Sequence, residues 1–174
     1  RLDGRLFFNT GRRINNGLIR LGHSVLGFSD RDIQKYYKSF KDIKGQKILN
    51  DKLKKTCYNY KPDIVITGHA DLISAQQIQE LREDYPNTKF SQWFLDPLNK
   101  RGPDFERNKN RILDKIKVMD TTFMTTSPSA LKFLPNKENS FFIPNPSDYS
   151  FETLNNFSKS CSVDVFFALS HGVH

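Results

Sequence analysis

The chain has 174 residues, of which 37% are hydrophobic and 13% aromatic, and a formal net charge of +8; these values suit one globular domain and exclude a disordered chain. No apolar run approaches the roughly 18 residues that span a bilayer. Cys57 and Cys161 lack metal-ligand spacing, which disfavours a zinc site or a disulfide framework and suits a reducing cytoplasm, where we expect the protein to be.

Two short strands and a helix between them are predicted near the start of the chain. Residues 6–9 form an apolar run, and apolar residues at helical spacing follow at Ile14, Leu18 and Leu21. A Gly-His pair at residues 22–23 closes that helix, and residues 24–28 are predicted to be the second strand. Ser29 then offers an N-cap to whatever helix follows.

A second helix and the clearest strand of the chain come next. One apolar stripe of a helix that Pro62 ends is formed by Ile48 or Leu49 together with Leu53, Cys57 and Tyr60. Residues 63–67 are rich in Ile and Val and show no polar alternation. That pattern is typical of a parallel strand whose two faces are both covered by helices.

The alternation of strands and helices continues downstream. Ser74 and Gln77 have the spacing of a capping box at the start of a helix. The remaining predicted strands are residues 89–95, 122–125 and 140–143 and a terminal strand after residue 162. The remaining predicted helices are residues 105–119 and 130–134, with a helical turn near 151–157. For the helix over 130–134, Ser127 would be the N-cap and Pro128 would occupy the first position.

This order predicts an α/β fold, a doubly wound parallel sheet of the Rossmann-like type. In the usual strand order, 3-2-1-4-5-6, the first and fourth strands are neighbours, and ligands bind at the switch point between them. The loops at that point are residues 9–13 and 95–99. Topology alone therefore makes both loops site candidates.

Gly11 and Arg12 lie where a glycine turn meets the start of a helix, which is a natural place to bind an anion. The segment is not a G-x-G-x-x-G motif, because the next glycine, Gly17, comes six residues later. A nicotinamide or flavin dinucleotide is therefore not supported. The structural alternative is a turn-forming glycine followed by solvated arginines.

His69 and Asp71 follow the strongest strand and so lie at the carboxyl edge of the sheet. A general base or a ligand for sugar hydroxyls would stand there. A structural role, in which His69 caps the next helix or binds a backbone carbonyl, remains equally open. His23 precedes a strand, at the opposite edge, and is interpreted as structural.

Trp93 and Asp96 combine an aromatic ring with a carboxylate just past a strand end, and Asn99 closes the same loop. This combination suits sugar binding, although core packing of Trp93 and turn formation by Asp96 remain alternatives. The chain contains no nucleophile elbow, P-loop, HExxH motif or paired-carboxylate spacing. A self-contained hydrolase or kinase is therefore disfavoured.

The positive charge is concentrated in two segments. Residues 31–61 hold ten Lys and Arg against three acids, and residues 100–117 hold seven against three. Five lysines recur at every third position from Lys35 to Lys47. A solvated basic face is the simplest interpretation, with anionic lipid headgroups or a phosphate-bearing substrate as alternatives. No aromatic stacking motif of an RNA-binding module accompanies them.

Several segments, in this order and spacing, resemble GT-B glycosyltransferases. The segment Asn16-Gly-Leu-Ile-Arg-Leu-Gly-His-Ser-Val25 is similar to the family's first helix and second strand. A narrower resemblance, to the spore-maturation-protein-B-like glycosyltransferases, is carried by residues 28–32, 60–68, 93–97, 123–128 and 143–146. Together the resemblance covers nearly the whole chain.

The resemblance implies an enzyme that transfers a hexose from a nucleotide-diphosphate sugar to an acceptor hydroxyl. Residues 1–160 would be the acceptor-binding domain, and residues 161–174 the start of a truncated donor-binding domain. The donor side would begin with Ser170, His171 and Gly172. Such enzymes generally need no bound metal or other cofactor.

We accordingly predict His69 and Asp96 as catalytic, and the substrate-binding set as Gly11, Arg12, Asp71, Trp93 and Asn99. The 174-residue chain alone is expected to be inactive. Two other functions stay open: a non-catalytic Rossmann-like module for a sugar or polyanion, and a basic adaptor for a membrane or nucleic acid, of which nucleic acid is disfavoured. The donor, the acceptor and the oligomeric state are left open.

Overall fold

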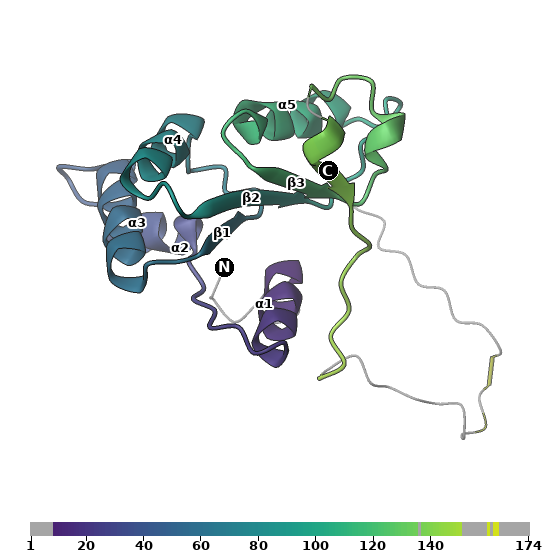
Figure 1. Cartoon of the computed structure of the whole chain (residues 1–174), viewed down its shortest axis with the longest axis horizontal. Helices are drawn as coiled ribbons and strands as arrows, with labels where there is room; N and C mark the ends of the chain where they lie inside the picture. Colours follow the sequence, from purple (N-terminus) through teal and green to yellow (C-terminus); the bar gives the residue numbers. More distant parts are fainter. Residues whose placement is uncertain (1–8, 136, 151–159, 161, 164–174) are drawn as a thin grey trace.

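The computed structural model describes residues 9–135, 137–150, 160 and 162–163 (Figure 1). Four strands form one parallel sheet in the order β1-β2-β3-β4. Their bounds are Ile64–Thr67 for β1, Lys89–Phe94 for β2, Thr121–Met124 for β3 and Ser140–Phe142 for β4. With helices packed against the sheet, the chain has an α/β Rossmann-like fold, as the sequence predicts.

The helices follow local signals that the sequence carries. They are α1 (Thr10–Arg20), α2 (Asp30–Tyr37), α3 (Gln46–Tyr60), α4 (Ala75–Asp84) and α5 (Phe105–Ile116), with short 3-10 turns at η1 (Pro128–Ala130) and η2 (Lys137–Asn139). The side chain of Ser29 accepts from the Asp32 N–H at the start of α2. Ser74 and Gln77 form the predicted capping box of α4.

The core lies on one face of the sheet. Partners in a parallel ladder point to the same side, so Val65, Phe90 and Met124 share a face with the helices. One cluster joins α3, α4 and β2 through Leu53, Cys57, Ile73, Ile78, Leu81, Phe90 and Met119. A second joins α5, β2 and β3 through Phe94, Leu98, Ile112, Ile116, Met124, Leu131 and Leu134.

The opposite face of the sheet is only partly covered, and here the prediction of a strand buried on both sides was wrong. Ile64 is 56% exposed and Ile66 42% exposed. Helix α1 lies on this side of the sheet, away from α4 and α5 (Figure 1), but none of its residues is buried. An apolar strand is fully buried only when helices pack on both faces, and among the described residues only one face is packed.

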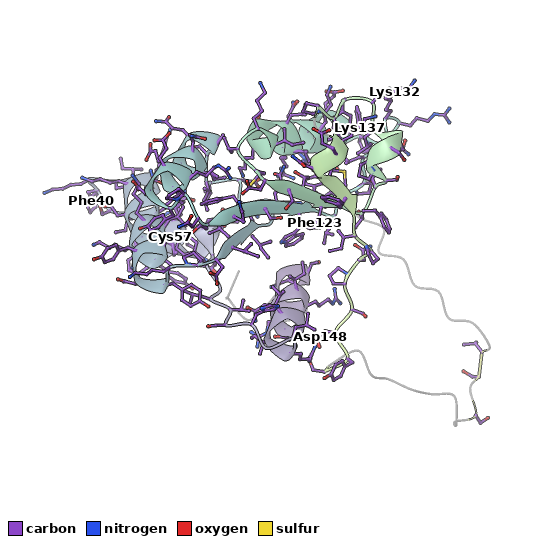
Figure 2. The ribbon with its side chains drawn as sticks, in the orientation of Figure 1. Phe40, Cys57, Phe123, Lys132, Lys137 and Asp148 are labelled. Carbon is purple, nitrogen blue, oxygen red and sulfur yellow. The ribbon has the colours of Figure 1, made fainter. Side chains whose placement is uncertain are left out.

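Helix α1 is instead tied to the segment that follows β4. Asp148, labelled in Figure 2, is buried and accepts from Asn16 Nδ2 at 2.6 Å and from the Arg20 guanidinium. The Arg20 guanidinium also lies 4.1 Å from the centroid of the Tyr149 ring. The hydrogen bonds from Ser150, Asn16 and Arg20 outweigh the opposing effect of burial and hold the pKa of Asp148 below its ordinary range.

Three other sequence predictions were wrong or too long. The predicted strand over 24–28 pairs with no strand of the described residues; Leu26 is 52% exposed, while Phe28 packs on the core. The third predicted strand pairs directly with the fourth, so the order that placed the first strand beside the fourth does not hold. The helix predicted over 130–134 is reduced to η1, where Ser127 makes no capping bond.

Some predictions fall outside the described residues. They are most of the strand over 6–9, the turn over 151–157 and the terminal strand with Ser170, His171 and Gly172. The domain boundary near residue 160 falls in the same part of the chain. In the portion that the structure describes, no helix combines the length and the apolar character needed to cross a bilayer.

Candidate active site

The carboxyl ends of β1 and β2 bring two predicted residues together. His69 follows β1 by two residues and Asp96 follows β2 by two residues, and these strands are parallel neighbours. The Nε2 atom of His69 lies 3.4 Å from Oδ2 of Asp96. The structure therefore places a histidine and a carboxylate in contact at the edge where parallel α/β sheets hold their ligands.

The His69 ring is half-buried against the sheet. Its centroid lies 5.0 Å from that of Phe94, with the two planes tilted by 30°. Burial lowers the pKa of His69 below its usual 6.5, and the charge of Arg111 lowers it further, while Asp96 acts in the opposite direction. A lowered pKa favours the uncharged imidazole, the state in which it can accept a proton.

Asp71 is the second carboxylate of the site, and two arginines hold it. Its Oδ2 accepts from Arg31 at 2.6 Å and from Arg111 at 3.2 Å. The Arg111 Nη1 atom also lies 3.8 Å from Asp96 Oδ2, so one guanidinium spans both carboxylates. This shared cation reduces the repulsion between two carboxylates at one sheet edge.

Lys115 supports the loop that carries His69 and Asp71. Its ammonium donates to the backbone carbonyls of His69 at 2.9 Å and Ala70 at 2.6 Å. Ala70 has a φ of 41°, an unusual conformation for a residue with a side chain. Burial lowers the pKa of Lys115, although Asp71 and Asp30 act to raise it. The lysine thus stabilises a strained loop beside the site.

One stripe of α5 positions both loops of the site. Asn108 is buried and donates to the Pro97 carbonyl at 3.3 Å, Arg111 spans the carboxylates, and Lys115 binds the loop after β1. We did not predict these roles. The signal was present, since residues 108, 111 and 115 have helical spacing and lie next to the buried Ile112 and Ile116.

A hollow of about 430 Å³ opens beside this cluster. The residues that line it come from the loop after β1, the start of α4 and the polar side of α5: His69, Asp71, Ile73, Ser74, Ala75, Gln76, Arg111, Asp114 and Lys115. Both hydrogen-bond donors and carboxylate acceptors face this space. Such a lining suits a small polyhydroxylated or anionic ligand better than an apolar one.

The other predicted site residues lie elsewhere or serve local structure. Trp93 points to the opposite face from Phe94, on which His69 stacks, and its indole packs so closely on Gly68 that an added Cβ would lie 3.0 Å from Cζ2. The Asn99 side chain accepts from the Arg101 N–H, which forms a turn. Gly11 and Arg12 lie in the first turn of α1, where the Arg12 N–H donates to Asn9 Oδ1.

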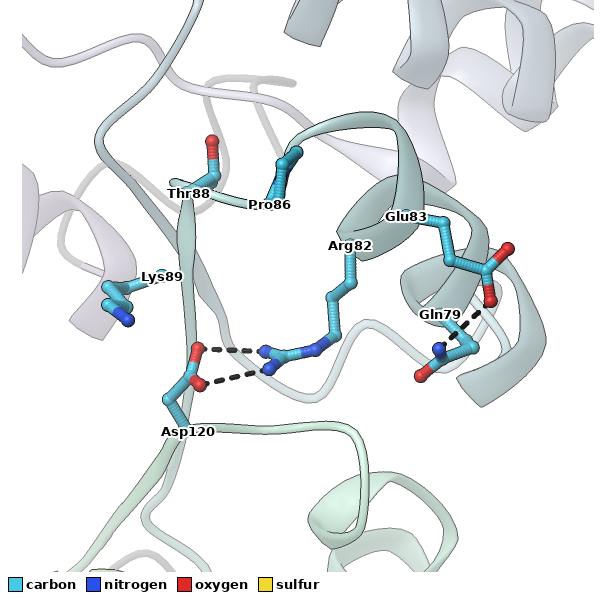
Figure 3. A pocket seen from close by; sticks show the side chains of 7 residues that line it. All are labelled: Gln79, Arg82, Glu83, Pro86, Thr88, Lys89 and Asp120. Carbon is cyan, nitrogen blue, oxygen red and sulfur yellow. Dashed lines mark hydrogen bonds and ion pairs between the residues drawn. The ribbon is translucent and has the colours of Figure 1, made fainter.

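A second hollow, of about 280 Å³, lies at the opposite edge of the sheet (Figure 3). Arg82 of α4 forms two hydrogen bonds with the carboxylate of Asp120, at 2.8 and 3.0 Å. Asp120 also accepts from the Phe90 N–H at 2.7 Å. These bonds tie α4 to β2 and to the start of β3, so we interpret this hollow as part of the fold's framework.

Metal binding finds no support in the described part of the chain. No group of three or more His, Cys, Asp or Glu side chains there could hold a metal ion.

Comparison with protein-family models, with curated proteins and with solved structures finds no match to this chain. The geometry of the site is therefore the main guide to its function.

Proposed function

We propose that this chain is the acceptor-binding half of a glycosyltransferase that moves a hexose from a nucleotide-diphosphate sugar to an acceptor hydroxyl. The observation that carries the proposal is the contact of 3.4 Å between His69 Nε2 and Asp96 Oδ2 at the carboxyl edge. A neutral histidine oriented by a carboxylate is a common general base in enzymes. The motif resemblance along the chain supplies the reaction class.

In this proposal His69 removes the proton of the acceptor hydroxyl. The proposal assigns the ring proton to Nε2, which lies 3.4 Å from Asp96 Oδ2, and leaves the lone pair of Nδ1 to accept the proton of the hydroxyl. The acceptor oxygen then bonds to the anomeric carbon of the donor, and the bond from that carbon to the diphosphate oxygen breaks. Asp96 stabilises the imidazolium that forms, because the two groups are already in contact.

Asp71 and Arg111 would bind the acceptor rather than react with it. Asp71 still has an Oδ1 atom to which no described residue donates, and sugar hydroxyls are good donors to carboxylates. The hollow of about 430 Å³ is large enough for one sugar residue. Donor binding by Ser170, His171 and Gly172, and a cytoplasmic location, belong to the same proposal.

A second candidate is a non-catalytic module that binds a sugar or a polyanion. Arg31, Arg111 and Lys115 bring three cations to one edge of the sheet, and this favours an anionic ligand. However, each cation already has a partner: Asp71 for the two arginines and backbone carbonyls for Lys115. An anion would have to compete with these contacts, so the transferase remains the better explanation.

Ligand titration by NMR distinguishes the two candidates. The histidine Cε1–H resonances of the 174-residue chain would be followed while methyl glucoside, methyl mannoside, methyl galactoside or sodium polyphosphate is added. The His69 resonance is the one missing in His69→Gln. We expect a glycoside to shift this resonance. In Asp96→Asn the affinity for the same glycoside should fall by about tenfold or more.

Asp120→Asn, at the opposite sheet edge, is the matched control and should leave the glycoside titration unchanged. A shift caused by polyphosphate alone would favour the binding module. If no glycoside shifted the His69 resonance, the acceptor site would be misplaced.

A further inference from the structure

The connection between α2 and α3 exposes large apolar side chains. Phe40 is fully exposed and Ile43 is 78% exposed, and Tyr36 in the last turn of α2 is 68% exposed. The connection protrudes from the side of the molecule that carries α3, far from Lys132 and Lys137 in Figure 2. Large apolar groups gathered on a protrusion usually contact a partner, because isolated proteins rarely expose such patches.

Lysines alternate with these apolar residues along the chain. Lys35, Lys38, Lys41, Lys44 and Lys47 lie within the same segment, whose only acid is Asp42. All five lysine residues are exposed. The segment therefore combines exposed apolar side chains with a concentrated positive charge.

The protrusion is a turn held by hydrogen bonds. The backbones of Ser39 and Asp42 exchange two hydrogen bonds, at 3.1 and 2.9 Å. The Asp42 carboxylate accepts from the Gln46 and Ile48 N–H groups, both at 3.0 Å, and so ties the turn to the start of α3. Asp42 is thereby engaged in the fold, and Phe40 with Lys41 is held at the tip.

Gly45 fixes the other end of the turn. Its φ is 61°, and an added Cβ would lie 2.8 Å from the Gln34 carbonyl oxygen. At Gly45 the turn therefore lies so close to α2 that a side chain at this position would clash with it. Because the backbone is held in this way, Phe40 and Ile43 cannot readily fold back onto the protein.

We propose that residues 36–44 dock on the surface of an anionic phospholipid bilayer. Phe40 and Ile43 would enter the boundary between headgroups and acyl chains, while the lysines would contact lipid phosphates. Single-stranded nucleic acid is a poorer partner, because Ile43 offers no flat ring for a base and the apolar groups lie on a tip instead of along a groove. The surface is separate from the His69 site, so the proposal stands or falls independently of the transferase.

Vesicle co-sedimentation tests this proposal on the 174-residue chain. Vesicles of phosphatidylcholine containing about one third phosphatidylglycerol should bind the protein, and pure phosphatidylcholine should bind it far more weakly. The double variant Lys41→Glu, Lys44→Glu should lower the partition coefficient by more than about tenfold. Phe40→Ser should lower it by about tenfold, because an apolar side chain no longer enters the bilayer.

Matched controls separate local docking from net charge. Lys132→Glu with Lys137→Glu changes the total charge by the same amount on exposed residues elsewhere, and Tyr58→Ser removes another exposed aromatic ring. Both controls should bind nearly as well as the wild type.

The proposal would be overturned by equal losses in the loop and control charge variants, by the absence of wild-type binding to anionic vesicles, or by release of the bound protein at low concentrations of poly(U). All variants replace exposed side chains, so an unchanged circular dichroism spectrum is expected for each.

Discussion

The ammonium of Lys115 donates a hydrogen bond of 2.6 Å to the backbone carbonyl of Ala70, which has a φ of 41°. This contact joins residues 45 positions apart and lets α5 determine the conformation of the loop after β1. His69 and Asp71 flank Ala70, so the same bond positions both site residues. The candidate active site thus depends on the helix that follows the next strand.

Replacement of Lys115 by methionine should destabilise the protein. The variant keeps an aliphatic side chain but leaves the backbone carbonyls of His69 and Ala70 without their donor. We expect the free energy of unfolding to fall by about 1–3 kcal/mol in urea titrations. Lys117→Met is the control, because Lys117 lies two residues away and is exposed. Equal stability of the two variants would show that the contact is unimportant.

Two substitutions should shift the pKa of His69 in opposite directions. Asp96 raises this pKa and Arg111 lowers it, while burial keeps it below 6.5. Asp96→Asn should therefore lower the pKa further, and Arg111→Met should raise it. NMR titration of the His69 Cε1–H resonance measures both values. Shifts of the same sign in the two variants would contradict the described geometry.

The ion pair between Arg82 and Asp120 should contribute to stability above the acid range. Hydrogen bonding by Arg82 lowers the pKa of Asp120 below 3.8, so its contribution is present above the unfolded pKa and is lost as pH falls through the folded one. Asp120→Asn should cost about 1–3 kcal/mol at pH 7. The difference from wild type should shrink on acidification in urea titrations; a constant difference would be inconsistent with this linkage.

Loss of the Asp148 carboxylate should loosen α1. Asn16 and Arg20 of that helix both donate to Asp148, and α1 buries no residue of its own. In Asp148→Asn we expect amide hydrogen exchange in α1 to speed up by roughly tenfold or more, with little change in β2. Asp51→Asn, an exposed change on α3, provides the comparison. Unchanged exchange in α1 would mean that other contacts hold it.

The sequence predicts local elements well where the signal is local. The helix stripe of Leu53 and Cys57, the capping box of Ser74 and the place of His69 and Asp96 at the carboxyl edge all depend on periodicity or on parallel-strand geometry. Pairing partners and face coverage depend on distant parts of the chain. For that reason the exposure of Ile64 and the unpaired segment over 24–28 were not predicted.

The supporting residues of the site were hidden for a related reason. Arg111 and Lys115 belong to a basic segment that resembles a solvated face when only charge is counted. Their function as loop supports appears only when α5 is packed on the sheet, since Lys115 meets Ala70 across 45 positions of sequence. Spacing relative to Ile112 and Ile116 was the available clue.

The transfer reaction itself tests the central claim most directly. Initial rates would be measured in the complete protein with UDP-glucose, UDP-galactose and GDP-mannose as donors and methyl hexosides as acceptors. With the pair that reacts, His69→Gln should lower kcat/KM by roughly a hundredfold or more, and Asp96→Asn should also lower it, while Asp120→Asn leaves it near the wild-type value. Unchanged kcat/KM in His69→Gln and Asp96→Asn would contradict the proposed role of this site.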